Sequence, residues 1–353
     1  MLMAMLYGAK DLRLERGDEP PVGDGQVKVR FGAGGICGSD LSYYGKGRVG
    51  DFAVMQPLCL GHEVSGEVVE VGAGVTRVKK GDRVAINPNQ PCRICRTCVA
   101  GKGHLCLKMN FYGSAAVFPH IQGVFREVIV ASEAQCFPVP QSCDFRTAAM
   151  AEPLAVALHA VRRAGLLVGK SVLVTGVGPI GSLCVLAARR AGAARIVVTD
   201  VADGALKRAE ALGIDDAVNA VSAPERVEAW YANKGSFDVT FECSGNAAAM
   251  TTAASLRSAD RVRDTNGAQT RGRPPLFNGL PRRVIGFICK MEFGRRSGGN
   301  TWRRRVRIKC AMNPAEFNRG GRWLPHIQGK NSSIGAAFQP KIARKPRQCW
   351  SLP

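Results

Sequence analysis

Four cysteines lie close together in a polar stretch rich in proline and glycine, spaced C-x2-C-x2-C-x7-C: Cys92, Cys95, Cys98 and Cys106. Thiolates so near in sequence can converge on one ion, and four sulfur ligands without water are typical of a closed structural Zn2+ site. Disulfides are the alternative, but a chain without a secretory signal is expected to keep its thiols reduced. The spacing therefore predicts a structural zinc site in a cysteine lobe at about 88–107.

A second group of potential ligands combines three kinds of donor atom. Cys37 stands in Gly-Ile-Cys-Gly-Ser-Asp, the pair His62-Glu63 begins 25 residues later, and Glu152 lies far downstream. Taken singly, a histidine can be a hydrogen-bonded core residue and a cysteine a small buried hydrophobe. A thiolate, an imidazole and a carboxylate together give a site with an open position, as catalytic zinc requires. Beside the cysteine lobe, this combination favours a second zinc site.

A glycine-rich turn follows a short apolar run and precedes a helical pattern. Its G-x-G-x-x-G signature occupies residues 176–181, and Asp200 ends the next apolar run 19 residues later. In a strand–turn–helix–strand–Asp setting this signature predicts dinucleotide binding, with the phosphates at the helix N-terminus. Asp200 would accept from the ribose hydroxyls and repel a 2′-phosphate, which favours NAD over NADP. The predicted cofactor-binding residues are Gly176, Val177, Gly178, Pro179, Ile180, Gly181 and Asp200.

The elements that must position these residues change character along the chain. Residues 1–150 alternate short apolar runs with glycine-rich turns, which predicts a β-rich domain. From 151 onwards, strand patterns at 171–175, 195–199 and 237–242 alternate with helical ones, which predicts parallel βαβ units. The expected fold is therefore α/β, with a β-rich domain at 1–150 and a doubly wound parallel sheet at 151–256.

The charge of the chain is divided unevenly. Residues 257–353 hold 22 Lys/Arg and 4 Asp/Glu, a net of +18 out of +21, whereas residues 1–256 are close to neutral with 27 and 24. The basic segment is rich in Arg, Gly and Pro and has no helical or strand period, so we expect it to be poorly folded. Thirteen cysteines, no signal peptide and no long apolar run favour a cytoplasmic protein that does not enter a membrane.

Together these motifs resemble the zinc-dependent medium-chain dehydrogenase/reductase family, and within it the sorbitol (polyol) dehydrogenase branch and the L-idonate 5-dehydrogenases above all. The resemblance covers residues 1 to about 256. It implies a GroES-like catalytic domain followed by a Rossmann domain. The matching segments are Gly35–Asp40, Leu60–Gly66, Asn87-Pro88, Phe111–Ala115, Pro119–Glu127 and Glu152–Ala157.

The resemblance also implies roles for individual residues. Cys37, His62 and Glu63 would bind the catalytic zinc, with Glu152 a ligand directly or through water, while the cysteine lobe would hold a second, structural zinc. Ser39 would pass the proton of the substrate hydroxyl towards solvent, and Tyr43 would line the substrate pocket. Zinc would act as a Lewis acid on the hydroxyl, and the carbon would deliver hydride to NAD.

The reaction implied is oxidation of a sugar acid or polyol, in the first place L-idonate to 5-keto-D-gluconate. Sorbitol-, xylitol- or L-threonine-type activity is the alternative. Arg126 is a candidate for a polyol or carboxylate contact, although an ordinary surface arginine is the competing interpretation. A homotetramer or homodimer is the family expectation.

Three features depart from the family pattern. Ser42 stands where the family usually has a histidine that extends the proton path, and His104 stands where the lobe commonly carries asparagine. Nothing after Arg257 follows the family plan, and the abrupt change inside a domain is what a shifted reading frame would produce. A basic nucleic-acid-binding tail on a non-catalytic protein is the rival interpretation. We therefore expect the Rossmann domain to be incomplete and this chain to be unstable with little dehydrogenase activity.

Overall fold

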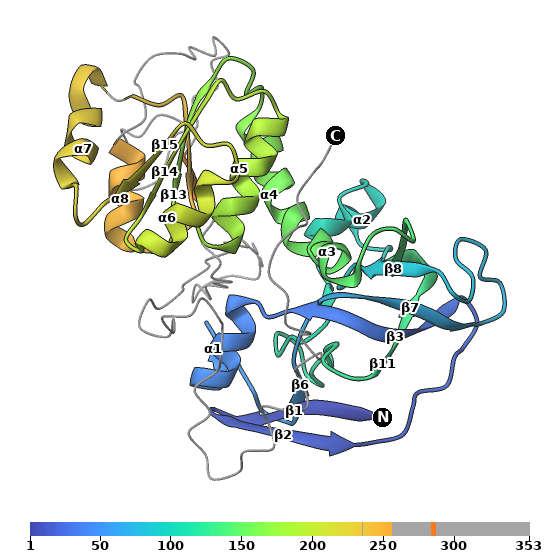
Figure 1. Ribbon diagram of the computed structural model, residues 1–353. Coiled ribbons are helices and arrows are strands. Elements are labelled where there is room, and N and C mark those ends of the chain that lie inside the picture. Colours follow the sequence, from blue (N-terminus) through green and yellow to red (C-terminus); the bar gives the residue numbers. More distant parts are fainter. Residues whose placement is uncertain (235, 256–283, 287–353) are drawn as a thin grey trace, which may run out of the picture. The chain divides into compact units, whose positions relative to one another are not determined.

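Strands dominate the first 140 residues of the computed structural model, which describes residues 1–234, 236–255 and 284–286 (Figure 1). The longest strand, β3, alternates buried Val27 and Val29 with Lys28 and Arg30, the period expected of a sheet with one covered face. The strands of this part are β1 (Leu2–Gly8), β2 (Asp11–Arg16), β3 (Gln26–Gly35), β4 (Arg48–Val49), β5 (Phe52–Ala53), β6 (Leu58–Cys59), β7 (Glu63–Val71), β8 (Arg83–Ile86), β9 (Asn89–Gln90), β10 (Asn110–Phe111), β11 (Val128–Ser132) and β12 (Cys136–Val139).

The main sheet of this part is antiparallel, in the order β11-β3-β7-β8-β12. Its inner face packs Val29, Val68 and Ile129 into one apolar cluster, which fixes the register of β3 against β7. The remaining strands of this part form a separate three-stranded sheet, β2-β1-β6, and two short pairs, β4-β5 and β9-β10. The helices of the first 150 residues are α1 (Gly38–Lys46), α2 (Arg96–Val99) and α3 (Phe145–Ala149), with 3-10 turns at Gly103–Leu105 and Glu133–Gln135.

From residue 151 the pattern changes to helices around a parallel sheet of order β15-β14-β13-β16-β17, as predicted (Figure 1). Val172 and Val174 face the helices α4, α5 and α6, whereas Leu173 faces the other side, near Trp230. Both faces are thus covered, which is typical of a doubly wound fold. The elements are α4 (Ala151–Ala164), β13 (Ser171–Thr175), α5 (Pro179–Arg190), β14 (Arg195–Asp200), α6 (Asp203–Glu210), β15 (Asp216–Asn219), α7 (Pro224–Glu228), a 3-10 turn (Ala229–Lys234), β16 (Val239–Glu242), α8 (Ala247–Ser255) and β17 (Val284–Gly286).

The fifth strand, β17, was not predicted. It pairs parallel with β16 from Val284 to Gly286, but three residues are too few to show a period in an arginine-rich context. The rest of residues 257–353, for which we predicted poor folding, lies outside the described residues.

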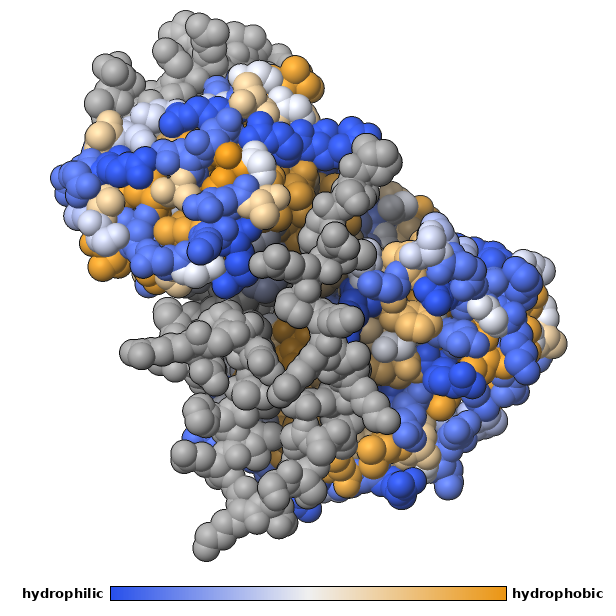
Figure 2. All heavy atoms as spheres, viewed as in Figure 1, coloured by the Kyte–Doolittle hydropathy of each residue, from blue (hydrophilic) through white to orange (hydrophobic). Residues whose placement is uncertain are grey.

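Charged and polar residues make up most of the visible surface of the described part, with smaller hydrophobic groups between them (Figure 2). None of the described helices has both the length and the apolar character that a membrane crossing requires.

Candidate functional site

The residues predicted to hold the catalytic zinc are brought together by the pairing of β3 with β7. Gly35 lies opposite Glu63 in the register, so Cys37, just after β3, comes beside His62, just before β7. The ligand atoms of Cys37, His62 and Glu63 all lie within 4.8 Å of one another, and we call these three residues the Cys37 cluster. Gly35 leaves room for this arrangement, because a Cβ there would lie 1.9 Å from Glu63 Oε2.

Asp40 ties the two halves of the Cys37 cluster together, a role that the sequence analysis did not assign. Its Oδ2 accepts a hydrogen bond from the Cys37 N–H at 2.9 Å, and its Oδ1 accepts one from the Gly61 N–H at 3.0 Å. Oδ1 also lies 3.8 Å from Nδ1 of His62. One buried carboxylate therefore fixes the backbone on both sides of the cluster, and its place three residues after Cys37 was the available signal.

Glycines shape the backbone next to His62. Gly61 has φ +90°, and a Cβ there would lie 2.4 Å from the ring of Phe125. A Cβ on Gly113 would approach the Gly61 carbonyl oxygen to 2.8 Å, and one on Gly123 would approach the Leu60 carbonyl oxygen to 2.3 Å. The peptide before His62 is thus enclosed by other backbone, which leaves the imidazole little freedom.

The electrostatics of the Cys37 cluster favour a bound cation. Burial first, and then the charge of Cys37, raise the pKa of Glu63 to about 8. Burial also raises the pKa of Asp40 to about 6, with the charge of His62 opposing it. Burial alone would lower the pKa of His62, but Asp40 and Cys37 outweigh it and raise that pKa well above its ordinary value. Several acidic groups this close together cannot all ionise without a large cost in free energy unless a cation binds among them.

The donor set fits such a cation. It offers sulfur, nitrogen and oxygen atoms, the set that Zn2+ accepts at catalytic sites. His62 is 5% exposed, and its Nδ1 has no hydrogen-bond partner among the described residues. Glu152, in the first turn of α4, is not one of the three clustered residues, but its charge acts on His62. Burial raises the pKa of Glu152, as it does for Glu63.

Two further residues of α1 were predicted to serve the reaction. Ser39 is half-buried in the first turn of the helix. Tyr43 is 3% exposed and packs with Leu6 and Leu58, and its hydroxyl oxygen accepts a hydrogen bond from the Ala115 N–H at 3.0 Å. Such burial leaves Tyr43 little surface for a substrate, and its lining of the pocket stays a prediction. The predicted contact of Arg126 with substrate also stays a prediction.

The four cysteines of the cysteine lobe also converge, with all four sulfur atoms within 4.8 Å of one another. Cys106 Sγ accepts hydrogen bonds from the N–H groups of Cys92 at 3.2 Å and Lys108 at 3.3 Å. The hydroxyl of Thr97, followed by nearby backbone N–H groups, lowers the pKa of Cys95 to about 5. Donors of this kind stabilise thiolates, the form that binds zinc. His104 lies at the edge of the lobe, with its ring centroid 6.0 Å from that of His159.

The predicted dinucleotide turn joins β13 to α5. Gly176 has φ +79°, and a Cβ there would lie 2.6 Å from the backbone of Ser244. A Cβ on Gly181 would lie 1.9 Å from the Gly176 carbonyl oxygen, so the helix packs closely against the turn. Gly178 precedes the helix and Pro179 is its first residue, which leaves backbone N–H groups available at this end.

Nearby backbone N–H groups already use part of the hydrogen-bonding capacity of the Asp200 carboxylate. Its Oδ1 accepts hydrogen bonds from the N–H groups of Val201 at 2.8 Å and Ala202 at 3.0 Å, and its Oδ2 accepts one from Val177 at 2.8 Å. A carboxylate oxygen has two lone pairs, so Oδ2 keeps one acceptor site for a ligand. Asp200 thus links the end of β14 to the glycine-rich turn.

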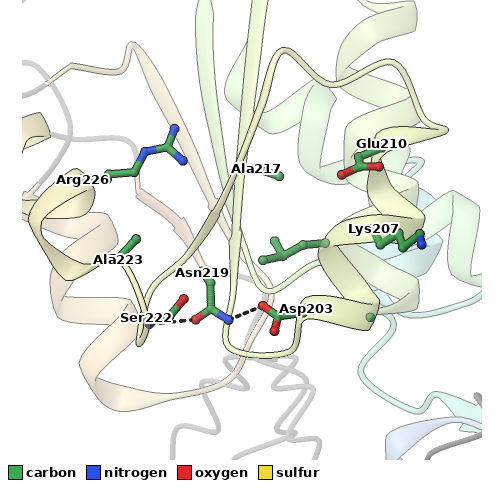
Figure 3. A pocket seen from close by; sticks show the side chains of 10 residues that line it. Asp203, Lys207, Glu210, Ala217, Asn219, Ser222, Ala223 and Arg226 are labelled. Atoms are coloured by element: carbon green, nitrogen blue, oxygen red, sulfur yellow. Dashed lines mark hydrogen bonds between the residues drawn. The ribbon is translucent and has the colours of Figure 1, made fainter.

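A groove of about 550 Å³ lies elsewhere, between α6, β15 and α7 (Figure 3). Within it, the Asn219 side-chain amide donates to Asp203 Oδ1 at 2.6 Å. Lys207 and Glu210 place opposite charges along one side. None of the predicted site residues lines this groove, so the candidate site does not include it.

Comparison with known proteins places this architecture in a family. Residues 23–141 match the alcohol dehydrogenase GroES-like domain, and residues 179–260 match the zinc-binding dehydrogenase family. The sorbitol dehydrogenase of Gallus gallus is 40% identical over 247 residues, which are 69% of this chain and 68% of that protein. The chain belongs to the zinc-dependent medium-chain dehydrogenases. Zinc and a nicotinamide dinucleotide are therefore its expected cofactors.

Two other relatives of this dehydrogenase are informative. The L-idonate 5-dehydrogenase (NAD(P)(+)) of Escherichia coli is 44% identical over 224 residues, and the match spans 64% of either chain. Its crystal structure superposes with a TM-score of 0.66 at 40% identity over 72% of both chains. A zinc-binding dehydrogenase from Sinorhizobium meliloti, solved with NADP, gives a TM-score of 0.67 at 31% identity, covering 73% of this chain and 74% of that one.

Proposed function

We propose that this dehydrogenase is built to oxidise a secondary alcohol of a sugar acid or polyol with NAD, and that its substrate is L-idonate, which would become 5-keto-D-gluconate. The Cys37 cluster supports the proposal most, because three different donor atoms within 4.8 Å suit an ion with an open position. The 44% identity to the L-idonate 5-dehydrogenase of Escherichia coli favours the substrate. The chain spans only 64% of the length of that relative, so the activity is proposed for the intact architecture.

In this proposal Cys37, His62 and Glu63 hold the catalytic zinc, and Glu152 assists directly or through water. When bound, the ion supplies Lewis acidity, which lowers the pKa of a substrate hydroxyl towards neutrality. Asp40 keeps the Cys37 and Gly61 backbones in place, so that the ligands are oriented before the ion arrives. Ser39, half-buried two residues after Cys37, accepts the proton of the substrate hydroxyl and passes it towards solvent.

The cysteine lobe has a different role in the proposal. Cys92, Cys95, Cys98 and Cys106 hold one structural zinc, which gives two ions per subunit. Four sulfur ligands leave no position for a substrate, so this ion organises the lobe and takes no part in the reaction.

The glycine-rich turn binds the pyrophosphate of NAD, which serves as the hydride acceptor. Backbone N–H groups at the start of α5 meet the phosphates, and Asp200 Oδ2 accepts from a ribose hydroxyl. A 2′-phosphate would be repelled by Asp200, and the next residues, Val201 to Asp203, offer no basic side chain to compensate. This favours NAD over NADP.

The substrate is tested with a panel of L-idonate, sorbitol, xylitol and L-threonine, each with NAD. The 40% identity to a sorbitol dehydrogenase makes sorbitol the main competitor. We expect the highest kcat/KM with L-idonate. Faster turnover of sorbitol or L-threonine would replace the proposed substrate, and a lack of turnover of all four by a chain with an intact Rossmann domain would contradict the function.

The activity also depends on residues 257–353, which we propose to be read out of frame. The match to the zinc-binding dehydrogenase family ends at residue 260, close to the change in composition. Sequencing the coding DNA across codons 250–270 and translating all three frames decides the point. We expect another frame to continue the family pattern, the chain as written to turn over little substrate, and the frame-corrected chain to be active. Robust activity of the chain as written would contradict the frameshift.

A further inference from the structure

Glu242 is a fully buried carboxylate at the end of β16 that the proposed reaction does not use. It is 0% exposed, and its Oε1 accepts hydrogen bonds from the N–H groups of Ser244 at 2.8 Å and Gly245 at 3.1 Å. The Ser244 hydroxyl donates to the same oxygen. Three donors from one loop on one carboxyl oxygen form a directional anchor.

The loop that Glu242 holds lies directly against the dinucleotide turn. A Cβ on Gly176 would approach the N and Cα atoms of Ser244 to 2.6 Å, so the two backbones touch. The neighbouring strands are in register, with Thr175 opposite Glu242, and the Cys243 N–H donates to the Thr175 carbonyl at 2.7 Å. Any shift of the loop at Ser244 would therefore displace the turn at Gly176.

The same loop also begins α8. The Ser244 hydroxyl oxygen accepts from the Asn246 N–H at 3.1 Å, and Asn246 Oδ1 accepts from the Ala248 N–H at 2.8 Å. A single carboxylate thus organises the segment from the end of β16 to the first turn of α8.

The choice of a carboxylate needs a reason beyond stability. Burying a charge is costly, and replacing a buried ionic group by an apolar one of similar volume is often neutral or stabilising. The second oxygen, Oε2, has no hydrogen-bond partner in the described part of the chain, which adds to that cost. What the carboxylate provides, and leucine would not, is a fixed position for the loop at Ser244.

We infer that Glu242 is a positioning residue for dinucleotide binding, which holds Ser244 and Gly245 against Gly176 and so keeps the turn in the shape that receives the pyrophosphate. This inference rests on the proposed function, because it assumes that the turn binds NAD.

The test compares three variants, each made in the full chain as written and in the frame-corrected full chain. Glu242→Leu removes the acceptor at similar volume, and Glu242→Gln keeps an acceptor oxygen in place. Thr240→Val is the matched control, because Thr240 is 0% exposed two residues earlier on the same strand and its hydroxyl has no hydrogen-bond partner among the described residues. NADH binding is measured by fluorescence titration, together with zinc content and the unfolding temperature.

We expect Glu242→Leu to raise the Kd for NADH by about tenfold or more, the equivalent of losing about 1.4 kcal/mol of binding free energy. Zinc content should stay the same, since the Cys37 cluster and the cysteine lobe do not involve this loop. Glu242→Gln should restore binding to within about threefold, and Thr240→Val should bind as the unsubstituted chain does.

Three results would overturn the inference. One is unchanged NADH binding by Glu242→Leu. Another is equal loss of binding in Glu242→Leu and Thr240→Val, which would indicate a general loss of packing. Failure of both the unsubstituted chain and its frame-corrected form to bind NADH would instead contradict the proposed function, and the inference with it.

Discussion

The Cys37 cluster and the cysteine lobe bring their ligand atoms equally close but by opposite means. The Cys37 cluster is positioned by the pairing of β3 with β7 and by hydrogen bonds to Asp40. The ring centroid of its buried His62 lies 5.1 Å from that of Phe111. Between residues 91 and 107, in contrast, only Cys106 is buried, and Ile94 and Val99 are 78% and 76% exposed. The first site is therefore set in a buried scaffold, whereas the second has local hydrogen bonds but almost no apolar core.

This difference predicts different roles for the two proposed zinc ions. A lobe without a core of its own must gain its stability from the metal, which contributes on the order of 10 kcal/mol in zinc-finger peptides. A site that is already organised does not need the free energy of metal binding to fold, so its ion can serve the reaction. Variants of one ligand in each site can therefore separate folding from function.

The largest effect is expected for Cys95→Ser. Loss of one thiolate should release the structural zinc and open the lobe, so trypsin should cut after Arg93, Arg96 or Lys102 roughly 100-fold faster. Zinc content should fall by one ion per chain. Unchanged proteolysis with one ion lost would show that the lobe has a scaffold of its own and would remove the contrast.

Cys37→Ser is the matched change in the other site. We expect zinc affinity there to fall by more than the roughly 10–100-fold typical of outer-shell changes, because a ligand itself is replaced. Trypsin cleavage of the lobe should stay as in the unsubstituted chain. Zinc titration against a competing chelator, in parallel with proteolysis, measures both. Faster cleavage of the lobe in this variant would mean that the two sites are not independent.

Asp40→Asn tests the scaffold itself. Asparagine keeps one acceptor oxygen, so one of the N–H groups of Cys37 and Gly61 loses its partner, and a charge near His62 disappears. The expected fall in zinc affinity is about 10–100-fold at the Cys37 cluster, with none at the cysteine lobe. The same chelator competition isolates the first site in a Cys95→Ser background, and measures the cysteine lobe when Asp40→Asn is the only substitution. Unaltered affinity would show that the strand register alone is sufficient.

The smallest effects are expected from two glycines. In Gly35→Ala the new methyl group would meet Glu63 Oε2, and rotation of that carboxylate should limit the loss of zinc affinity to about fivefold. In Gly101→Ala the space is open, but φ is +72°, so the lobe should lose about 1 kcal/mol of stability. Chelator competition measures the zinc affinity of Gly35→Ala, and urea-dependent proteolysis measures the stability of the lobe in Gly101→Ala. A loss of zinc affinity far above fivefold in Gly35→Ala, or unchanged stability of the lobe in Gly101→Ala, would contradict these expectations.

The two regions also differ in how well the sequence predicts them. The convergence of the four cysteines of the lobe could be predicted because they fall within 15 residues, whereas their binding of zinc stays a prediction. The ligands of the Cys37 cluster could be recognised by type, but the contact of Asp40 with Gly61 spans 21 residues and depends on the pairing of β3 with β7. Long-range register is not visible as a local period.

The same reason explains what was missed in the α/β part. The strand patterns at 171–175 and 195–199 predicted β13 and β14 because buried parallel strands are continuous apolar runs. Glu242 ends the strand that was predicted at 237–242, and the positioning role inferred for it becomes apparent only when Ser244 is seen to touch Gly176. An acidic residue at the end of an otherwise apolar strand was the signal that could have directed attention there.

The glycines around His62 carry a consequence for the substitutions that these positions tolerate. Glycine is the smallest residue, so at Gly61, Gly113 and Gly123 every replacement pushes a side chain into backbone or a ring. We therefore expect no other amino acid to be neutral at any of the three positions.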